Sequence, residues 1–499
     1  MQGTASALSA GLLGIDGYVV KVTATVELGA PSLTISGRSS PSLDEARERV
    51  RHALGRHALG RCGHPLPPRR QTISIEPEEA DSPGLDLAVA CALLAAHGVV
   101  PESSLEGLLL WGELTLDGTV RPAPATLVAA DLAQRRDIGR IAVAASDAGV
   151  QAVAKFIKVL PVSTLEELVS ILRNGEVPAW GRRLAPEDRQ AAFAELRGKA
   201  PPADQQLDMA DIRGLSLGRR ALEVALAGGH SLLLHGPHGV GRTMLARRAG
   251  GLLPDLTPRG AMEVSKIHGL VRRQSSAQLI RRPPVCMPHH TVSSAGLFGG
   301  GHPPRPGEVT LAHRGVLFLD DLPEMPLSYI EGLRAVLRDG LVDLPWRRRT
   351  VHLPASFILI ATMSDCPCGY RGHPERACVC SDEAVARYRS RVPLDLFDMI
   401  VNVAPITSEE IEAGTGEASE PIRRRIEAAR SLNKDRPAPS AEAADSDVRR
   451  ELAGLTSSSS ARVLRVAQTI AGLEGHSGRP SAAHVHEARS LRIEPGAGE

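Results

Sequence analysis

Residues 231–248, SLLLHGPHGVGRTMLARR, decide the fold, because they have the pattern of a strand, a glycine loop and a helix in succession. The loop fits the spacing G-x-x-x-x-G-[KR]-T over Gly236, Pro237, His238, Gly239, Val240, Gly241, Arg242 and Thr243. Glycines allow backbone N–H groups to wrap around a phosphate, and the Thr243 hydroxyl is the expected Mg²⁺ ligand. We interpret the stretch as a phosphate-binding loop, with a generic glycine turn as the alternative.

Arg242 stands where such loops usually carry a lysine. Arginine keeps the positive charge, but its bulky, forked guanidinium cannot imitate a compact ammonium between two phosphates. The chain contains only six lysines among its 58 basic residues, so any chemistry that needs a lysine has few places to find one.

A second motif, GVLFLDDLPEM, follows about eighty residues later at 315–325. Four apolar strand residues lead into Asp320 and Asp321, which is the form of a Walker B strand. We expect Asp320 to hold Mg²⁺ through water. Asp321 occupies the position of the glutamate that polarises the attacking water, one methylene shorter. A solvated acidic pair at a strand end is the alternative.

Four of the seven cysteines lie within fifteen residues, namely Cys366, Cys368, Cys378 and Cys380. Thiolates at this density suit a tetrahedral Zn²⁺ ion with a structural role, because four protein ligands leave no position open for water. Four reduced surface thiols are the alternative, and His373 inside the loop is a competing ligand.

The composition indicates a globular chain of roughly three domains, with 499 residues, 42% hydrophobic and 23% charged residues. The formal net charge of +1 excludes a whole-chain attraction to nucleic acid or membrane, so DNA contact would need local patches of basic residues.

Basic runs occur at 272–273, 281–282 and 347–349, and solvated faces explain them as readily as phosphate contacts. The absence of an apolar run of 18 residues and of a basic leader predicts no membrane span and a cytoplasmic protein.

The order of patterns predicts an α/β protein with several parts. Residues 1–175 mix strands at 19–28, 33–37 and 71–77 with helices at 43–59 and 85–98 and a hairpin around Asp117-Gly118. Residues 176–205 read as a linker rich in proline and charge, and 206–405 as alternating strands and helices of a parallel sheet. We expect a low-complexity linker at 406–446 and a helical lid at 447–499.

Taken together, the motifs resemble the ComM/YifB family of Mg-chelatase-like AAA+ ATPases, and the likeness covers almost the whole chain. It is carried by the phosphate loop and by residues 287–301, 304–325, 366–380 and 462–475, with 12–17, 48–54, 85–96 and 112–122 in the N-terminal part. The resemblance implies a non-proteolytic domain similar to the C-terminal domain of Lon protease, an AAA+ core with the shared cysteine cluster, and a helical lid. It also implies ATP, Mg²⁺, a hexameric ring or a mixed ring with a paralogue, and DNA branch migration.

Five positions depart from the family pattern. Arg242 replaces the loop lysine, and Asp321 replaces the Walker B glutamate. Ser364 stands in the position of the sensor 1 asparagine, and Leu396 in that of the trans-acting arginine finger. Ser458 stands in the position of the sensor 2 arginine, for which Arg462 is a substitute after a local slip in the alignment. An arginine finger alone is worth about 10³–10⁵ in rate. We therefore expect an ATP-binding protein with weak or lost hydrolysis; the alternative is an active hexameric ATP-driven DNA translocase. A zinc protein without nucleotide would leave the phosphate loop unexplained.

The Lon-like resemblance raises the question of peptidase activity through a serine and lysine pair. Ser82 lies near the nucleophile position, and the lysine position falls close to Leu127. No lysine occurs between Lys21 and Lys155, so the activating amine is missing and we expect no proteolysis.

Overall fold

The computed structural model describes residues 3–36, 41–54, 69–77, 80, 82–147, 154, 157–175, 207–271, 279–301, 304–346, 349–412, 416–434, 436–437, 439–440 and 445–495. The chain divides into two compact units, residues 1–199 with 257–281, and residues 200–256 with 282–499. The predicted linker at 176–205 lies outside the described residues. No helix in the described ranges is long and apolar enough to cross a membrane.

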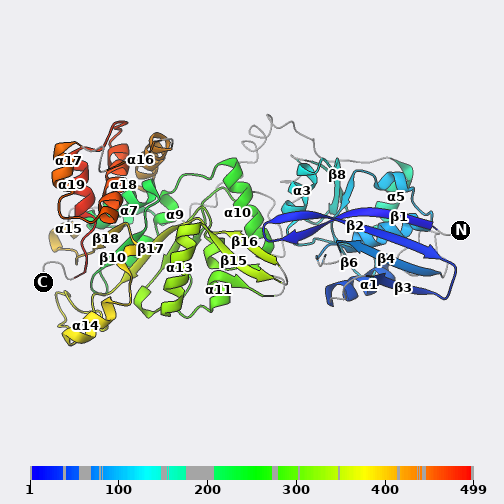
Figure 1. The fold of residues 1–499 in the computed structure, drawn as a ribbon, viewed down its shortest axis with the longest axis horizontal. Coiled ribbons are helices and arrows are strands. Elements are labelled where there is room, and N and C mark those ends of the chain that lie inside the picture. The colour runs from blue at the N-terminus through cyan, green and yellow to red at the C-terminus, as the bar shows by residue number, and fades with distance from the viewer. Residues whose placement is uncertain are drawn as a thin grey trace. The chain divides into compact units, whose positions relative to one another are not determined.

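The first unit is built on a seven-stranded mixed sheet in the order β3-β4-β2-β1-β5-β8-β9. Its strands are β1 (Gly3–Leu13), β2 (Asp16–Glu27), β3 (Ser32–Ser36), β4 (Arg70–Glu76), β5 (Leu108–Leu110), β8 (Arg140–Ala144) and β9 (Lys158–Val162). The long antiparallel hairpin of β1 and β2, dark blue in Figure 1, runs in register from Gly3 opposite Val26 to Leu13 opposite Asp16. The predicted strands at 19–28, 33–37 and 71–77 correspond to β2, β3 and β4.

The helices of this unit are α1 (Pro41–Leu54), α2 (Asp86–Ala96), α3 (Thr126–Arg135), α5 (Leu165–Asn174) and α10 (Pro258–Val271), with η1 (Glu102–Leu105). Helix α2 is apolar on every side and lies in the core, because its positions from Leu87 to Leu94 are all buried. The predicted hairpin around Asp117-Gly118 is confirmed by the antiparallel pair β6 (Glu113–Leu114) and β7 (Val120–Arg121). The helix predicted at 43–59 is described only to Leu54.

Helix α10 groups with the first unit, although the sequence suggested that 206–405 forms one core. It packs against α3, and the Lys266 ammonium, 9% exposed, pairs with Asp131 on that helix. A buried cation needs such a partner, and this pairing over 135 residues leaves no signature in local sequence.

The second unit contains a five-stranded sheet of parallel strands in the order β11-β14-β17-β10-β18, which confirms the predicted parallel sheet (Figure 1). The strands are β11 (Val285–Cys286), β14 (Val316–Leu319), β17 (Ile358–Met363), β10 (Leu232–His235) and β18 (Met399–Asn402). Strand β17 lies between β10 and β14, so its carboxyl end lies between the ends of the strands that carry the two predicted motifs.

The connecting elements of this unit are short. They are η4 (Met209–Asp211), α7 (Ser216–Gly228), α8 (Arg242–Ala246), α9 (Ala249–Leu252), α11 (Ser294–Phe298), β12 (Gly299–Gly300), β13 (Arg305–Pro306), α12 (Glu308–Leu311), η5 (Leu322–Glu324), α13 (Leu327–Asp339), β15 (Leu341–Trp346), β16 (Arg349–Pro354), α14 (Asp382–Arg389), η6 (Leu394–Leu396) and α15 (Ser408–Glu412).

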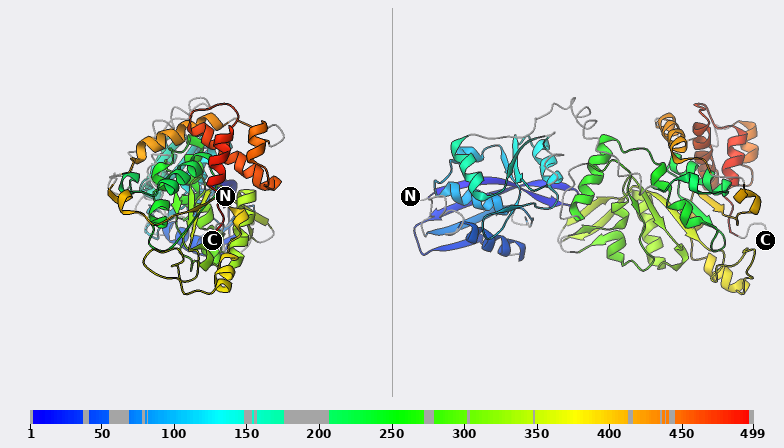
Figure 2. Two further views of the ribbon diagram at one scale, coloured as in Figure 1. Left: turned by 90° about the vertical axis from the view of Figure 1, so that its left-hand side faces the viewer. Right: turned by 180° about the vertical axis from the view of Figure 1, so that it is seen from behind.

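Two of the C-terminal helices, α16 and α18, pack on α7, while α19 packs on α18 and α17 packs on α19. They share one apolar core with the sheet, and Figure 2 shows them gathered in orange and red. They are α16 (Ser419–Asn433), α17 (Ser446–Glu451), α18 (Ser457–Leu473) and α19 (Ala482–Ser490). The expectation of a linker over 406–446 was wrong for α16. Its Ile422, Ile426 and Ala429 are buried at helical spacing, which a composition rich in Arg, Glu, Ala and Ser concealed.

Candidate functional site

The predicted phosphate loop connects β10 to α8 at the carboxyl edge of the parallel sheet, where α/β proteins place their ligands. Gly236, Gly239 and Gly241 have φ of +146°, +81° and +96°, values that side chains rarely allow. A Cβ atom on Gly236 would lie 2.4 Å from the Val403 carbonyl oxygen. The loop glycines are therefore required by backbone conformation and, at Gly236, by a close approach to the end of β18.

Thr243 and Asp320, the two candidate Mg²⁺ ligands, face each other across this edge. The Thr243 hydroxyl lies 3.1 Å from both carboxylate oxygens of Asp320. A hydroxyl that donates to a carboxylate keeps its oxygen lone pairs for a cation, and both are oxygen ligands of the kind that Mg²⁺ prefers. Thr243 would hold Mg²⁺ directly, and Asp320 would hold it through water.

Thr362, near the end of β17, completes this arrangement and was missed by sequence reasoning. Its hydroxyl donates to Asp320 Oδ1 at 2.6 Å and accepts the Asp321 backbone N–H at 2.9 Å. Asp321 has φ +47°, a left-handed conformation that aspartate tolerates better than most residues. No spacing rule connects a threonine on one strand to an aspartate on another, so only the tertiary structure identifies Thr362.

The Arg242 side chain is buried and turns toward the end of β17. Its guanidinium donates to the Met363 carbonyl and, at 3.2 Å, to the Ser364 hydroxyl. Burial lowers the pKa of Arg242, while the carboxylates of Asp321 and Asp320 act against that shift. The residue in the lysine position is therefore bonded to the residue in the sensor 1 position.

A further buried pair joins the same segments. His235, the last residue of β10, places Nδ1 at 2.9 Å from Asp365 Oδ1, and both residues are buried. No local pattern predicts this contact, because it connects positions 130 residues apart.

The four predicted zinc ligands come together in the loop between β17 and α14. Sγ atoms lie 3.4 Å apart between Cys366 and Cys368, 3.6 Å between Cys368 and Cys378, and 3.5 Å between Cys378 and Cys366. All four cysteines, Cys380 included, have their sulfurs within 4.8 Å of one another. A tetrahedral ion with Zn–S of about 2.3 Å sets its sulfurs about 3.8 Å apart, so the cluster fits Zn²⁺.

The cysteine loop contacts the phosphate loop directly. The backbone N–H of His238 donates to the Gly369 carbonyl at 2.9 Å, and the His238 and Tyr370 rings meet edge to face at 5.9 Å. Gly369 lies between Cys368 and Cys378 in sequence, and its own N–H closes a turn onto the Cys366 carbonyl at 3.0 Å. The position of the Gly369 carbonyl thus depends on how the cysteines are held.

A second group of metal-type side chains, Glu474, His476 and His484, lies at the end of α18 and the start of α19. His484 Nδ1 accepts the Ser481 backbone N–H at 2.9 Å, which places the imidazole proton on Nε2. Nε2 then donates to Glu474 at 3.0 Å. This arrangement caps a helix and uses the nitrogen that a metal would need.

Comparison with known proteins agrees with these motifs. The family described as magnesium chelatase, subunit ChlI, matches residues 208–411, and one described as subunit ChlI of Mg-chelatase matches 22–147. Competence protein ComM of Haemophilus influenzae is 31% identical over 433 residues, which cover 85% of this chain and 81% of that protein. The chain belongs to the ComM/YifB family of magnesium-chelatase-like proteins.

Two further family members are similar over the same extent. YifB of Escherichia coli is 35% identical over 437 residues, covering 84% of this chain and 80% of its own length. An uncharacterized protein of Mycobacterium tuberculosis is 36% identical over 437 residues, covering 86% and 83%. The α/β architecture with its parallel sheet is that of the Mg-chelatase-like AAA+ fold.

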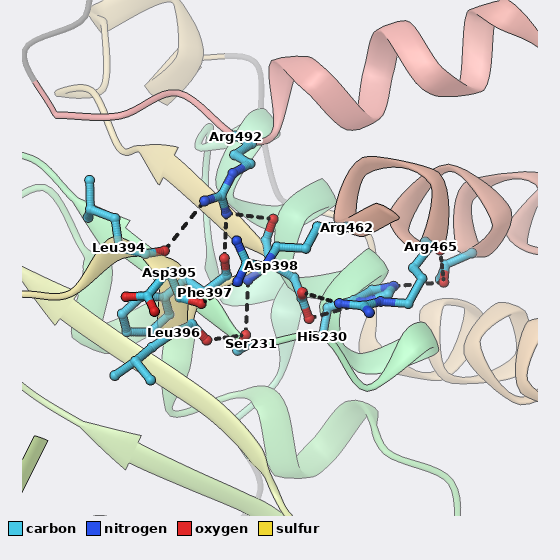
Figure 3. A network of polar contacts seen from close by, with 11 residues as sticks. His230, Ser231, Leu394, Asp395, Leu396, Phe397, Asp398, Arg462, Arg465 and Arg492 are labelled. Atoms are coloured by element: carbon cyan, nitrogen blue, oxygen red, sulfur yellow. Dashed lines mark hydrogen bonds and ion pairs between the residues drawn. The ribbon is translucent and has the colours of Figure 1, made fainter. Parts of the chain in front are cut away.

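Leu396, the position that the family resemblance assigns to the arginine finger, lies beside Ser231 at the amino end of β10, whereas the phosphate loop follows the carboxyl end of that strand; Figure 3 shows Leu396 and Ser231 side by side. The Leu396 carbonyl accepts from the Ser231 hydroxyl at 2.8 Å, and Ser231 immediately precedes β10. Strand β10 has four residues, so the two edges are separated by about 13 Å. A side chain at position 396 therefore lies at the amino end of the strands, remote from the phosphate loop of its own chain.

Arg462, the candidate sensor 2 substitute, also lies at this remote edge. It donates to the Asp395 carbonyl at 2.9 Å (Figure 3). Ser458 lies in the first turn of α18, with its hydroxyl 3.2 Å from Thr456 Oγ1. The structure thus places Arg462 beside Asp395 and not at the phosphate loop.

Asp398 anchors the C-terminal helices to this edge. Arg465 of α18 donates to Asp398 Oδ1 at 2.8 Å, and Arg492 donates to the Asp398 carbonyl at 3.2 Å (Figure 3). Burial works to raise the pKa of Asp398, but His230 and Arg465 outweigh it and lower the pKa to about 2.

The remaining sequence candidates have simple surroundings. The Ser82 hydroxyl is 3.4 Å from the Pro83 carbonyl, and Leu127 is buried in α3. These contacts do not test the expected absence of proteolysis, which stays a prediction. Arg281 and Arg282 are half-buried, whereas residues 272–273 and 347–348 lie outside the described ranges.

Proposed function

We propose that this chain is an ATP-binding AAA+ protein of the ComM/YifB family whose hydrolysis is weak or lost. The observation that carries the proposal is the meeting of Thr243 and Asp320 at the carboxyl edge of the sheet, beside the glycine loop. A hydroxyl and a carboxylate about 3 Å apart suit the Mg²⁺ that accompanies a nucleotide phosphate. The loop N–H groups and Thr243 would bind the phosphates.

Weak hydrolysis is supported by where the altered residues lie. Arg242 directs its donors to Met363 and Ser364, and Ser364 is shorter than the asparagine that the family resemblance implies. Asp321 is one methylene shorter than glutamate and sits in a left-handed backbone conformation. Loss of one positioned charge-stabilising donor typically costs about 10²–10³ in rate, and loss of a trans-acting arginine about 10³–10⁵.

Zn²⁺ and assembly are further parts of this proposal. The Cys366, Cys368, Cys378 and Cys380 cluster would hold Zn²⁺ in a structural role, since all four positions come from the protein. A homo-hexamer, or a mixed ring with an intact paralogue that acts on DNA, follows from the family resemblance. In a mixed ring this chain would contribute nucleotide binding and the intact subunits turnover.

The competing function is active DNA translocation. It is favoured by one feature: both carboxylates, Asp320 and Asp321, remain at the end of β14. The two functions are separated by measuring nucleotide affinity and DNA-stimulated ATPase for the native chain and for the double variant Arg242→Lys, Leu396→Arg. We expect binding without robust native turnover, and a gain of turnover in the variant. Robust native turnover would overturn weak hydrolysis, and absence of nucleotide binding would overturn both functions.

A further inference from the structure

The Arg242 side chain has its hydrogen-bond donors committed to β17. Its guanidinium reaches past the phosphate loop to the Met363 carbonyl and the Ser364 hydroxyl, and the residue is only 6% exposed. A buried carbonyl that loses its donor pays a desolvation cost, so the guanidinium is held in this direction. The shorter ammonium of a lysine could not reach both acceptors with a forked geometry.

The surroundings of Arg242 are acidic. Asp320 and Asp321 follow β14, Asp365 follows β17, and all three interact electrostatically with its guanidinium. The charge of Arg242 is therefore balanced by neighbouring carboxylates, which also repel any added negative charge. A terminal phosphate placed beyond the loop would meet this acidic group without a free guanidinium to offset it.

A nucleoside diphosphate can bind at the same site without the hydrogen-bond donors of Arg242. Its phosphates can be held by the backbone N–H groups of the loop and by Mg²⁺ on Thr243 and Asp320, none of which requires the donors of Arg242. A triphosphate must in addition draw Arg242 away from β17 or accept an uncompensated charge.

We propose that the site is selective for nucleoside diphosphates over triphosphates, with Arg242 as the specificity-determining residue and Ser364 as its anchor. The inference rests on the proposed nucleotide binding and deepens it. It assigns a physical role to two departures from the family pattern: the arginine and the small hydroxyl residue that accepts from it.

The test compares the affinities of the full chain for ADP and for a non-hydrolysable imido analogue of ATP, both with Mg²⁺, by isothermal titration calorimetry. One retained buried hydrogen bond corresponds to roughly a tenfold preference, so we expect ADP to bind the native chain about tenfold more tightly. Arg242→Lys should reduce that ratio to about threefold or less, because a lysine cannot stay bonded to both acceptors.

Ser364→Ala provides a second, milder variant if Arg242→Lys does not fold, and it should also reduce the ratio by releasing one donor. Arg247→Lys is the matched control, because Arg247 is exposed one turn further along and should leave the ratio unchanged. Equal or tighter binding of the ATP analogue by the native chain overturns the inference, as does a ratio unchanged in both variants. If neither nucleotide binds, the proposed function is overturned instead.

Discussion

Thr362 joins the two strands that flank the candidate site, because one hydroxyl serves both Asp320 and the Asp321 backbone. We predict that Thr362→Val, which keeps the shape but removes the hydroxyl, lowers the free energy of unfolding by about 1–3 kcal/mol. The same change should weaken Mg²⁺-dependent nucleotide binding, since Asp320 loses the donor that orients it. Urea denaturation and titration of nucleotide with and without Mg²⁺ measure the two effects.

Thr310→Val is the matched control for that change. Thr310 is fully buried, and its hydroxyl has no hydrogen-bond partner among the described residues. Replacing it should leave stability unchanged or slightly raised. Equal losses in both variants would show that burial of a valine, and not the loss of the Asp320 contact, explains the effect.

The lowered pKa of Asp398 predicts how the free energy of unfolding depends on pH. Its folded pKa of about 2 lies below the usual 3.8, so its stabilisation is complete above about pH 4 and is lost as pH falls through about 2. Asp398→Asn should lower the free energy of unfolding by about 2 kcal/mol at pH 7, and by about half as much near pH 3. Urea denaturation of both proteins from pH 7 to 3 measures the difference.

Asp447, an exposed aspartate, is the control for Asp398. It pairs with Arg450 at 3.5 Å on the surface of α17, where such pairs contribute little. Asp447→Asn should therefore change stability only slightly at every pH. A pH-independent deficit in Asp398→Asn would contradict the assignment of the low pKa to its ion pairs.

At the scale of elements, the cysteine loop and the phosphate loop are joined by the hydrogen bond from His238 to Gly369. We predict that removing Zn²⁺ with a chelator weakens ADP binding about threefold to tenfold, the range for one hydrogen bond. His238→Pro, which lacks the N–H, should bind ADP equally with and without Zn²⁺. Zinc content and ADP affinity are measured on the same samples.

His238→Ala separates the backbone contact from the ring. It keeps the N–H that donates to Gly369 but loses the ring that meets Tyr370. It should therefore retain the zinc dependence of ADP affinity. If the native affinity stayed unchanged after complete zinc removal, the coupling between the two loops would be refuted.

Helix α16 provides a second test at this scale. Ile426 is fully buried in the core that the C-terminal helices share with the sheet. Ile426→Ala should cost about 2–5 kcal/mol of unfolding free energy, because it leaves a cavity in that core. Glu427→Ala on the exposed face is the control and should have little effect. Similar small losses in both would indicate a linker after all.

At the scale of the whole molecule, the position of Leu396 determines which site an arginine there could serve. It lies at the amino end of β10, whereas the phosphate loop of the same chain follows the carboxyl end of that strand. Leu396→Arg alone and Arg242→Lys alone should both show little ATPase activity. A mixture of the two variants should show more, because the arginine of one subunit reaches the repaired loop of its neighbour.

That mixture is tested by ATPase measurements at constant total protein and varied proportions. Activity should peak when both variants are present and fall on dilution below the assembly concentration. A linear dependence on composition, with no maximum, would contradict action between subunits.

Much of the site follows from the sequence. The glycine loop, Asp320, Asp321 and the four cysteines are short patterns whose chemistry depends on local spacing. The partners of these residues did not follow in the same way. Arg242 contacts Met363 and Ser364 across more than 120 residues, and α16 lacked an obvious apolar pattern because its buried face is narrow.

The sequence by itself determined the α/β class and identified the glycine loop, the aspartate pair and the cysteine cluster as candidates, because neighbouring residues encode turns, strands and ligand spacing. Only the tertiary structure decided where Arg242 points, that Thr362 and the His235–Asp365 pair complete the edge, and that position 396 is remote from the loop. These features depend on which strands become neighbours. Strand order in a parallel sheet is set by packing between distant segments, and no local pattern records it.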